Sequence, residues 1–168
     1  MRSVILLVPA LLAGASAAPV GLPDQDRSRL EELAHAYLQR RADKVTDAPP
    51  APGFGVPTTP ELAARLAGHE VALGTAKAST RTRYRAAVVR TQAERFHADQ
   101  TGRVVVARVH EHTELHFAEP GPVPHTAYGL PHLLTFSRSG AGWLLSDVAL
   151  GHYKHCALLP ETQRPSEC

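Results

Sequence analysis

The chain is poor in cysteine and in aromatic residues: two cysteines, one tryptophan and 5% aromatic residues occur among its 168 positions. Two thiols are half the usual ligand count of a structural zinc site, so a zinc site built from cysteines is excluded. The formal net charge is only +2, and no basic block occurs. Neither nucleic acid nor an anionic membrane surface is therefore predicted as a partner.

Motifs of the large enzyme classes are also missing. The sequence contains no G-x-S-x-G elbow, no P-loop and no G-x-G-x-x-G segment, so no cofactor is predicted. Asp147 could be paired on paper with any of several histidines, but no spacing in the sequence requires a Ser-His-Asp arrangement. The sequence therefore does not name a reaction.

The N-terminus has the features of a secretory signal. Residues 1–3 supply a positive charge, residues 4–12 form an apolar run, and residues 15–17 offer an A-x-A site for signal peptidase. The run is too short to cross a hydrocarbon core of about 30 Å, and no later stretch is apolar enough to span a membrane. We expect cleavage between Ala17 and Ala18 and a secreted mature chain. An N-terminal core helix is the alternative.

The mature chain, residues 18–168, has the length of a single domain, and residues 151–168 are expected to form a short tail. In an exported protein, two cysteines suggest a disulfide. A bond between Cys156 and Cys168 would tie down this tail. Two free thiols are the alternative.

An apolar stripe with helical spacing predicts a first helix over residues 24–46. The stripe should face the core and the polar positions should face water; the stripe is Leu30, Leu33, Tyr37 and Leu38, and the polar set is Glu31, Glu32, Gln39, Arg40 and Arg41. A second helix is expected to begin with a capping box of Thr58 and Glu61, with Pro60 in its first turn, and to end near Lys77.

From residue 82 onward the apolar period changes to that of a strand. Two hairpins are predicted, with strands at 83–97, 103–117, 130–138 and 143–150 and an irregular loop at 118–129. Helices followed by strands predict an α+β domain, with the helices packed on one face of an antiparallel sheet. Such long strands must curve, giving a cone-like half-barrel around the first helix.

Residues 110–116, HEHTELH, place three histidines and two glutamates in seven positions. Side chains on a strand alternate between its two faces. The odd positions from 105 to 117 are the more apolar and should face the helices. The three histidines, His110, His112 and His116, should therefore share the opposite, wetter face.

A shared face is one requirement of a metal site, and zinc takes three or four ligands held by further hydrogen bonds. The helical H-E-x-x-H pattern is missed, however, because Glu114 stands where the second histidine would be. An exposed face rich in Arg, His and Glu is ordinary for a sheet with one solvated side. We therefore interpret the histidines as a solvated face and predict no metal.

Glu111 is the one charged residue expected on the inner face. It has two interpretations: a functional carboxylate inside the cone, or a strand-edge residue that reaches water, which is the favoured one. Trp143, at the start of the last strand, is expected in the core. His35, near the edge of the helical stripe, is expected to be structural.

Two stretches, residues 33–46 (LAHAYLQRRADKVT) and residues 106–150, carry a family resemblance. They resemble the region that precedes the catalytic domain in secreted amidase-domain proteins of GC-rich bacteria. The matching positions are residues 36–42 in the helix, and then 111–115, 126–131 and 143–147. The resemblance implies the nuclear-transport-factor-like, or cystatin-like, cone fold. That superfamily hosts isomerases, cyclases and many binding or accessory modules.

The matched segments are packing and loop signatures rather than catalytic ones, and neither cysteine lies in a motif that matches the amidase nucleophile. The resemblance therefore implies the accessory fold without the amidase activity. Two functions follow. The first is a secreted, non-catalytic module of the cell envelope or exterior that binds a small ligand, a cell-wall component or a protein.

The alternative is a small cone-fold enzyme, isomerase- or cyclase-like, that transfers protons with polar cavity groups. Its candidate residues are Glu111, His132 and Tyr37. A cavity with two or more buried titratable groups near these residues would favour the enzyme. An apolar, filled cone would favour the module.

Overall fold

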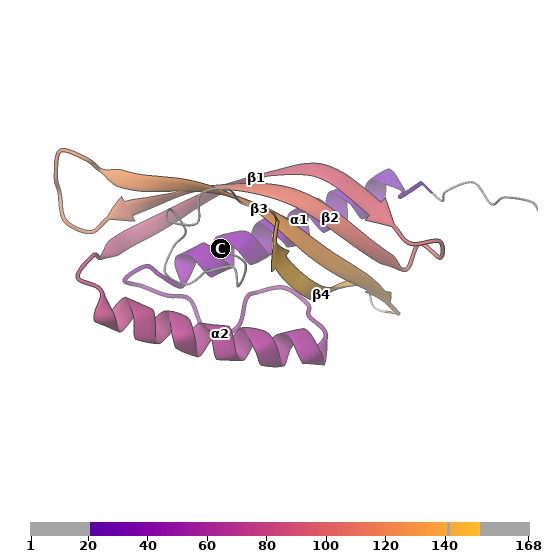
Figure 1. Ribbon diagram of the computed structural model, residues 1–168, viewed down its shortest axis with the longest axis horizontal. Coiled ribbons are helices and arrows are strands. Elements are labelled where there is room, and N and C mark those ends of the chain that lie inside the picture. Colours follow the sequence, from indigo (N-terminus) through magenta and orange to yellow (C-terminus); the bar gives the residue numbers. More distant parts are fainter. Residues whose placement is uncertain (1–20, 141, 152–168) are drawn as a thin grey trace, which may run out of the picture.

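The computed structural model describes residues 21–140 and 142–151. They form α1 (Asp24–Asp43), α2 (Pro60–Ser79), β1 (Tyr84–Ala98), β2 (Val104–Phe117), β3 (His125–Ser139) and β4 (Gly142–Leu150). The strands make one open antiparallel sheet in the order β1-β2-β3-β4, and both helices lie on the same side of it (Figure 1). The predicted α+β class, with helices on one face of an antiparallel sheet, is confirmed.

The predicted apolar stripe of α1 is buried, but the helix ends at Asp43 rather than near Thr46. The three residues after it form a tighter turn, in which each backbone N–H donates to the carbonyl three residues earlier. One polar position was assigned to the wrong environment. Arg41 was expected to face water, yet it is buried, because it pairs with a carboxylate inside the domain.

The N-cap of α2 is Thr59, not the predicted Thr58. The Thr59 side chain accepts a hydrogen bond from the backbone N–H of Leu62 at 3.4 Å, and Pro60 occupies the first turn as expected. Thr58 instead forms a parallel bridge with Leu145 of β4. The proline-rich connection therefore ends as a short addition to that edge of the sheet.

The four strands lie where the alternation predicts, except that β3 begins five residues early. Residues 125–129 were expected in an irregular loop, but they continue the ladder with the end of β2, where Thr126 pairs with Leu115 and Gly129 pairs with His112. The end of β2 offers backbone partners to residues 125–129. The chain therefore forms hydrogen-bonded pairs with β2 from His125, directly after Pro124.

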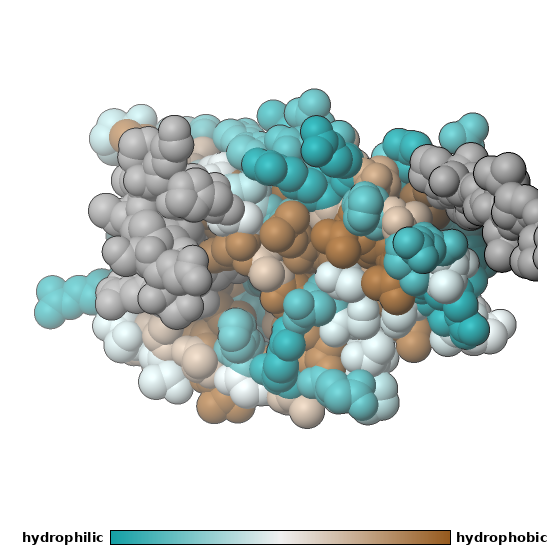
Figure 2. Space-filling view, turned by 45° about the vertical axis from the view of Figure 1, so that its right-hand side comes forward, coloured by the Kyte–Doolittle hydropathy of each residue, from teal (hydrophilic) through white to brown (hydrophobic). Residues whose placement is uncertain are grey.

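The core lies between the helices and the inner face of the sheet. In β2 the odd positions from 105 to 115 are buried, and the even positions are exposed or partly exposed, so the predicted assignment of the two faces is confirmed. Trp143 is in this core as expected. Figure 2 shows hydrophobic residues gathered in a band at mid-height, with hydrophilic residues above it and residues of mixed hydropathy below it.

Three of the sequence predictions fall outside the described residues, wholly or except for residue 151. These are the cleavage site between Ala17 and Ala18, the tail at 151–168 and the disulfide between Cys156 and Cys168, and all three remain predictions. Among the helices that the structure describes, none is long and apolar enough to cross a membrane.

Candidate functional site

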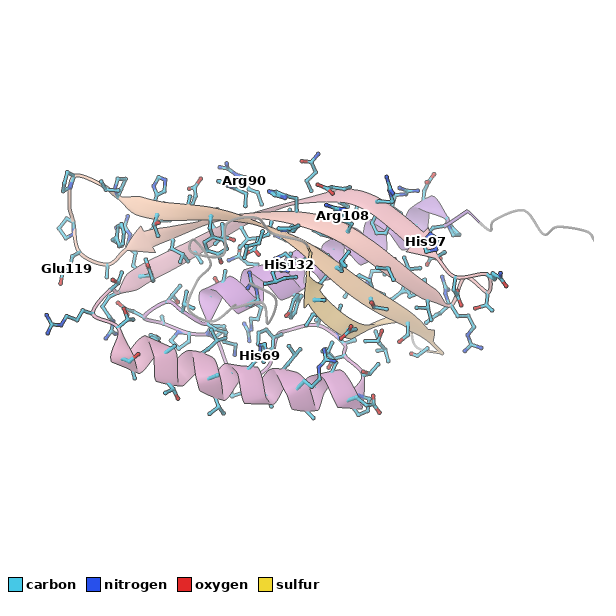
Figure 3. All side chains as sticks on the ribbon, in the orientation of Figure 1. His69, Arg90, His97, Arg108, Glu119 and His132 are labelled. Atoms are coloured by element: carbon cyan, nitrogen blue, oxygen red, sulfur yellow. The ribbon has the colours of Figure 1, made fainter. Side chains whose placement is uncertain are left out.

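A buried ionic network centred on Glu111 lies between α1 and the inner face of the sheet. The carboxylate contacts Arg41 Nη2 at 2.5 Å, His132 Nε2 at 2.6 Å and Thr113 Oγ1 at 2.5 Å. The helix α1 supplies the arginine, β2 the carboxylate and the hydroxyl, and β3 the histidine. Glu111 is 0% exposed, and all three partners are buried. His132 lies between the sheet and α1 in Figure 3.

Strand alternation and register explain why these side chains meet. Glu111 and Thr113 are two positions apart on β2, so they share the inner face. His132 pairs with Val109, which places it diagonally opposite Glu111 on the same face. Arg41 comes from α1, which packs on the inner face of the sheet, and its guanidinium completes the network from the side of the helix.

The carboxyl group of Glu111 is ionised at neutral pH. Burial alone would raise its pKa, but the charge of Arg41 and the hydrogen bonds from His132 and Thr113 outweigh burial and lower the pKa from 4.5 to about 2. Burial also opposes the charge on Arg41, yet the attraction of Glu111 outweighs it and raises the pKa of Arg41 above its ordinary value. The two buried charges therefore stabilise each other.

The imidazole of His132 is neutral at pH 7. Burial lowers its pKa below 6.5, although the hydrogen bond to Glu111 acts in the opposite direction. An ionised carboxylate can only accept hydrogen bonds, so we assign the ring hydrogen of His132 to Nε2. The network then holds one cation, one anion and one neutral ring.

Two tyrosines border the network. Burial is the main cause that raises the pKa of Tyr128 to about 12 and that of Tyr37 above 10, against the opposing charge of Arg41. Both hydroxyls therefore stay protonated at neutral pH. The ring of Tyr37 also packs against Phe54, with the centroids 5.6 Å apart. Within the described part of the chain, Arg41 Nε is buried without a hydrogen-bond partner.

The structure brings the enzyme candidates into one neighbourhood, so the buried titratable groups that the enzyme alternative requires are present, although none of them lines the described pocket. Glu111 and His132 are in direct contact, and the charge of Glu111 affects the pKa of Tyr37. The favoured interpretation of Glu111 as a residue that reaches water is wrong, because Arg41 compensates its charge in the interior. Sequence reasoning missed Arg41. The signal was its position four residues after Tyr37, in line with the apolar stripe of α1.

The histidines of the HEHTELH segment lie on the opposite face of the sheet. His110 and His112 are exposed, and His116 is partly exposed. Glu114 lies 3.9 Å from His112 Nε2 and 3.6 Å from His116 Nε2. The described residues contain no group of three or more His, Cys, Asp or Glu side chains arranged to hold a metal ion.

Arginines flank these histidines on the same outer face, where Arg90 and Arg108 point away from the helices (Figure 3). Arg108 pairs with Glu94 at 2.8 Å, and Arg90 lies 3.8 Å from Glu114. Since most of these side chains are well exposed, each pair contributes little to stability. This face is therefore a solvated surface of mixed charge.

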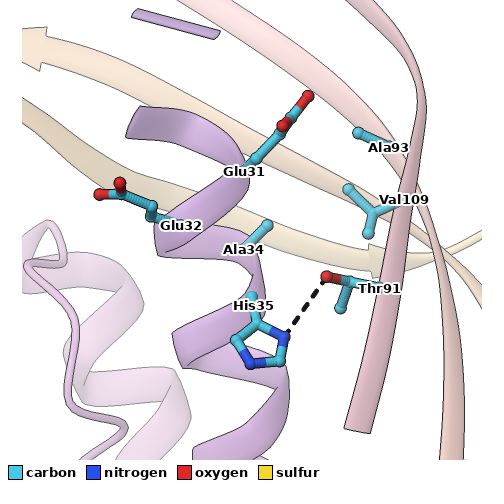
Figure 4. A pocket seen from close by; sticks show the side chains of 7 residues that line it. All are labelled: Glu31, Glu32, Ala34, His35, Thr91, Ala93 and Val109. Atoms are coloured by element: carbon cyan, nitrogen blue, oxygen red, sulfur yellow. Dashed lines mark hydrogen bonds between the residues drawn. The ribbon is translucent and has the colours of Figure 1, made fainter. Parts of the chain in front are cut away.

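A pocket of about 310 Å³ opens between α1 and β1 (Figure 4). It lies on the inner side of the sheet, and none of the residues of the Glu111 network lines it, although Val109 of its lining is the strand partner of His132. Ala34, Ala93 and Val109 give it an apolar lining, and Glu31, Glu32, His35 and Thr91 supply its polar groups. His35 Nδ1 lies 3.4 Å from Thr91 Oγ1.

Comparison of the chain with protein-family models, with curated proteins and with solved structures found no match. Function is therefore inferred from the geometry of the described residues and from the sequence resemblance of residues 33–46 and 106–150.

Proposed function

We propose that this chain is an exported, non-catalytic cone-fold domain that serves as a binding or accessory module of the cell envelope or exterior. The observation that carries the proposal is the saturation of the Glu111 carboxylate. Its two oxygens take hydrogen bonds from an arginine, a histidine and a threonine, all within the domain.

A carboxylate in this state is a poor catalyst. A general base must have a pKa near the working pH and must reach the proton that it removes. The pKa of Glu111 is about 2, and three internal donors already occupy its oxygens. The buried charge pair ties α1 to the sheet, which is the role expected of a structural anchor.

The sequence resemblance supports the same proposal, because the segments that carry it coincide with the packed scaffold. Residues 36–42 include the helical side of the network, and residues 111–115 include its carboxylate. The remaining part of the proposal concerns the partner, which is a protein, a cell-wall component or a small ligand of the extracellular space.

Solution NMR of the mature chain tests whether the network is a structural anchor. A fragment library and a soluble gadolinium chelate are added while the signals of Tyr37, Glu111 and His132 are followed. We expect these signals to remain unchanged, with the exposed His112 as the positive control for the chelate. Fragments that bind at Glu111 and His132 would favour the enzyme instead.

Binding is tested with the purified mature chain and isolated bacterial cell envelopes, wall sacculi and secreted proteins in parallel. Retention of the folded domain on one of these fractions, and no retention of a heat-unfolded and aggregate-free sample, is the expected result. Absence of binding to all three fractions would contradict the module.

A further inference from the structure

The backbone of β1 faces outward along one edge of the sheet, and α1 occupies part of that edge. β1 is the first strand in the sheet order, so one row of its backbone groups has no strand partner among the residues that the structure describes. Gln39 of α1 takes two of these groups. Its side chain donates to Ala87 O at 3.1 Å and accepts from Val89 N at 3.1 Å. Gln39 thus pairs with the edge as a residue of an added strand would.

The next edge groups belong to Thr91 and Ala93. In an antiparallel strand, the N–H and C=O of one residue point to the same side, and this side alternates along the chain. Because Ala87 and Val89 face the edge, Thr91 and Ala93 do so as well. Among the described residues, no hydrogen bond beyond the β1–β2 pairing engages their backbone groups. The register shift between Ala93 and Arg95 then ends the regular edge.

A row of polar side chains on α1 runs alongside this edge. Glu31, His35 and Gln39 are four residues apart, a step of about 6 Å along a helix. Alternate residues of a strand are separated by a similar step of about 7 Å. Gln39 therefore meets Val89, and His35 meets the side chain of Thr91. Figure 4 shows Glu31 one turn from His35 toward the N-terminus of α1, on the side of Ala93.

The pocket described above lies beneath the exposed part of this edge. Its apolar lining suits one aliphatic side chain, and its mouth carries the carboxylates of Glu31 and Glu32. Glu32 forms an ion pair with Arg29 at 2.9 Å, whereas Glu31 has no ion-pair partner among the described residues. The groove between α1 and β1 therefore combines unpaired backbone, a small pocket with a partly apolar lining, and negative charge.

The opposite edge of the sheet, formed by β4, is paired with backbone groups of another segment. Leu145, in the middle of β4, donates to Pro57 O at 2.9 Å and accepts from Thr59 N at 3.0 Å. The connection between the helices thus covers the edge of β4 with backbone. On β1, Asp47 N donates to Tyr84 O at 2.7 Å near the start of the strand, and Gln39 pairs with Ala87 and Val89. Among the described residues, this cover of the edge ends at Val89.

We propose that the groove between α1 and β1 binds an extended, basic segment of a partner protein as an added strand. The segment pairs with the backbone of Thr91 and Ala93, places an aliphatic side chain in the pocket, and sets lysine or arginine beside Glu31 and Glu32. Backbone pairing gives affinity in such complexes, and alternate side chains give specificity. This inference rests on the proposed function and names its partner class.

The test uses a fluorescein-labelled Lys-Val-Lys-Val-Lys peptide and the full mature chain. Fluorescence anisotropy at low salt measures affinity, and amide hydrogen exchange by NMR locates the peptide. Two comparison peptides keep the test specific. One has N-methyl groups on alternate backbone nitrogens, which removes donors without changing side chains, and the other replaces each lysine by glutamate.

We expect saturable binding with slower exchange at the amides of Thr91 and Ala93. N-methylation should weaken binding at least about tenfold, because each methylated nitrogen can no longer donate a hydrogen bond to the backbone of β1. Glu31→Gln should weaken it about threefold, the effect of one partly exposed charge pair. Glu94→Gln, a matched change on the outer face of the same strand, should leave the affinity unchanged.

Absence of binding up to about 1 mM peptide, equal binding of the N-methylated or acidic peptide, or protection confined to other amides would each overturn the proposal. These results leave the proposed function intact if the domain still binds envelope or secreted material. Failure of both assays, together with fragment binding at Glu111, would overturn both proposals.

Discussion

The guanidinium of Arg41 and the carboxylate of Glu111 meet at 2.5 Å in the interior of the domain, although they are 70 positions apart in the sequence. One belongs to the first helix and the other to the centre of the sheet. Arg41 is 8% exposed and Glu111 is 0% exposed. Removal of either charge therefore leaves the other uncompensated away from water.

Glu111→Gln should cost about 3–5 kcal/mol of unfolding free energy, because the variant keeps the shape of the side chain but leaves the Arg41 charge buried and unpaired. Urea unfolding followed by circular dichroism measures the loss. Glu94→Gln is the control, since it breaks an exposed pair with Arg108 and should cost about 0.2–1 kcal/mol. Similar losses in the two variants would contradict a buried charge pair.

The stability of the domain should decrease in two stages as the pH is lowered from 7. His132 has a lowered pKa in the folded protein, so the unfolded chain binds its proton first, and stability declines as the pH falls below about 6.5. The pKa of Glu111 is lowered to about 2. Its stabilising effect is present above the ordinary value of 4.5 and is lost as the pH falls toward 2.

Urea midpoints at pH 7, 5 and 3 test both stages. His132→Gln keeps a donor for Glu111 but cannot take up a proton, so it should flatten the change between pH 7 and pH 5. The decline between pH 5 and pH 3 should remain in this variant. A wild-type stability that rises as the pH falls from 7 to 5 would contradict a neutral, buried His132.

Val109→Asp should unfold the domain or cost several kcal/mol, since position 109 is buried in the core, where a carboxylate would lose its hydration. His110→Asp, one position along, changes an exposed side chain and should alter stability by a few tenths of a kcal/mol. Thermal melts of the two variants, recorded together, make the comparison. A larger loss in the His110 variant would mean that the two faces of β2 are reversed.

Zinc should not bind tightly to the HEHTELH face. His112 and His116 point to the solvated side, and the described residues around them include no group of three or more ligating side chains arranged to hold a metal ion. Isothermal titration calorimetry at pH 7 should give no one-to-one complex of sub-micromolar affinity. Such a complex, abolished by His112→Ala, would refute the interpretation of this face as solvated.

Gln39→Ala should cost about 1 kcal/mol, because two backbone groups of β1 lose their partner. Gln92→Ala on the outer face of the same strand is the matched control and should be nearly neutral. Chemical unfolding measures both, and amide exchange at Val89 should quicken only in the Gln39 variant. Unchanged exchange there would contradict the pairing of Gln39 with the edge.

The sequence was sufficient for the fold class and for the two faces of β2, because both depend on local periodicity. It was not sufficient for the buried network. Strand alternation placed Glu111 on the inner face, but helical periodicity assigned Arg41 to water. The two side chains are held in the interior by each other, a relationship between distant positions that local periodicity does not contain. The start of β3 was missed for a similar reason, since residues 125–129 become a strand only through their partners on β2.

The unequal edges of the sheet also limit how copies of this chain could assemble. The middle of β4 is already paired through Leu145, so a neighbouring molecule cannot continue the sheet from β1 of one copy to the centre of β4 of the next. Head-to-tail contacts of that kind generate open-ended fibres. Pairing of β1 with β1 would instead relate two copies by a twofold axis and end there, so the covered edge at Leu145 opposes fibre growth.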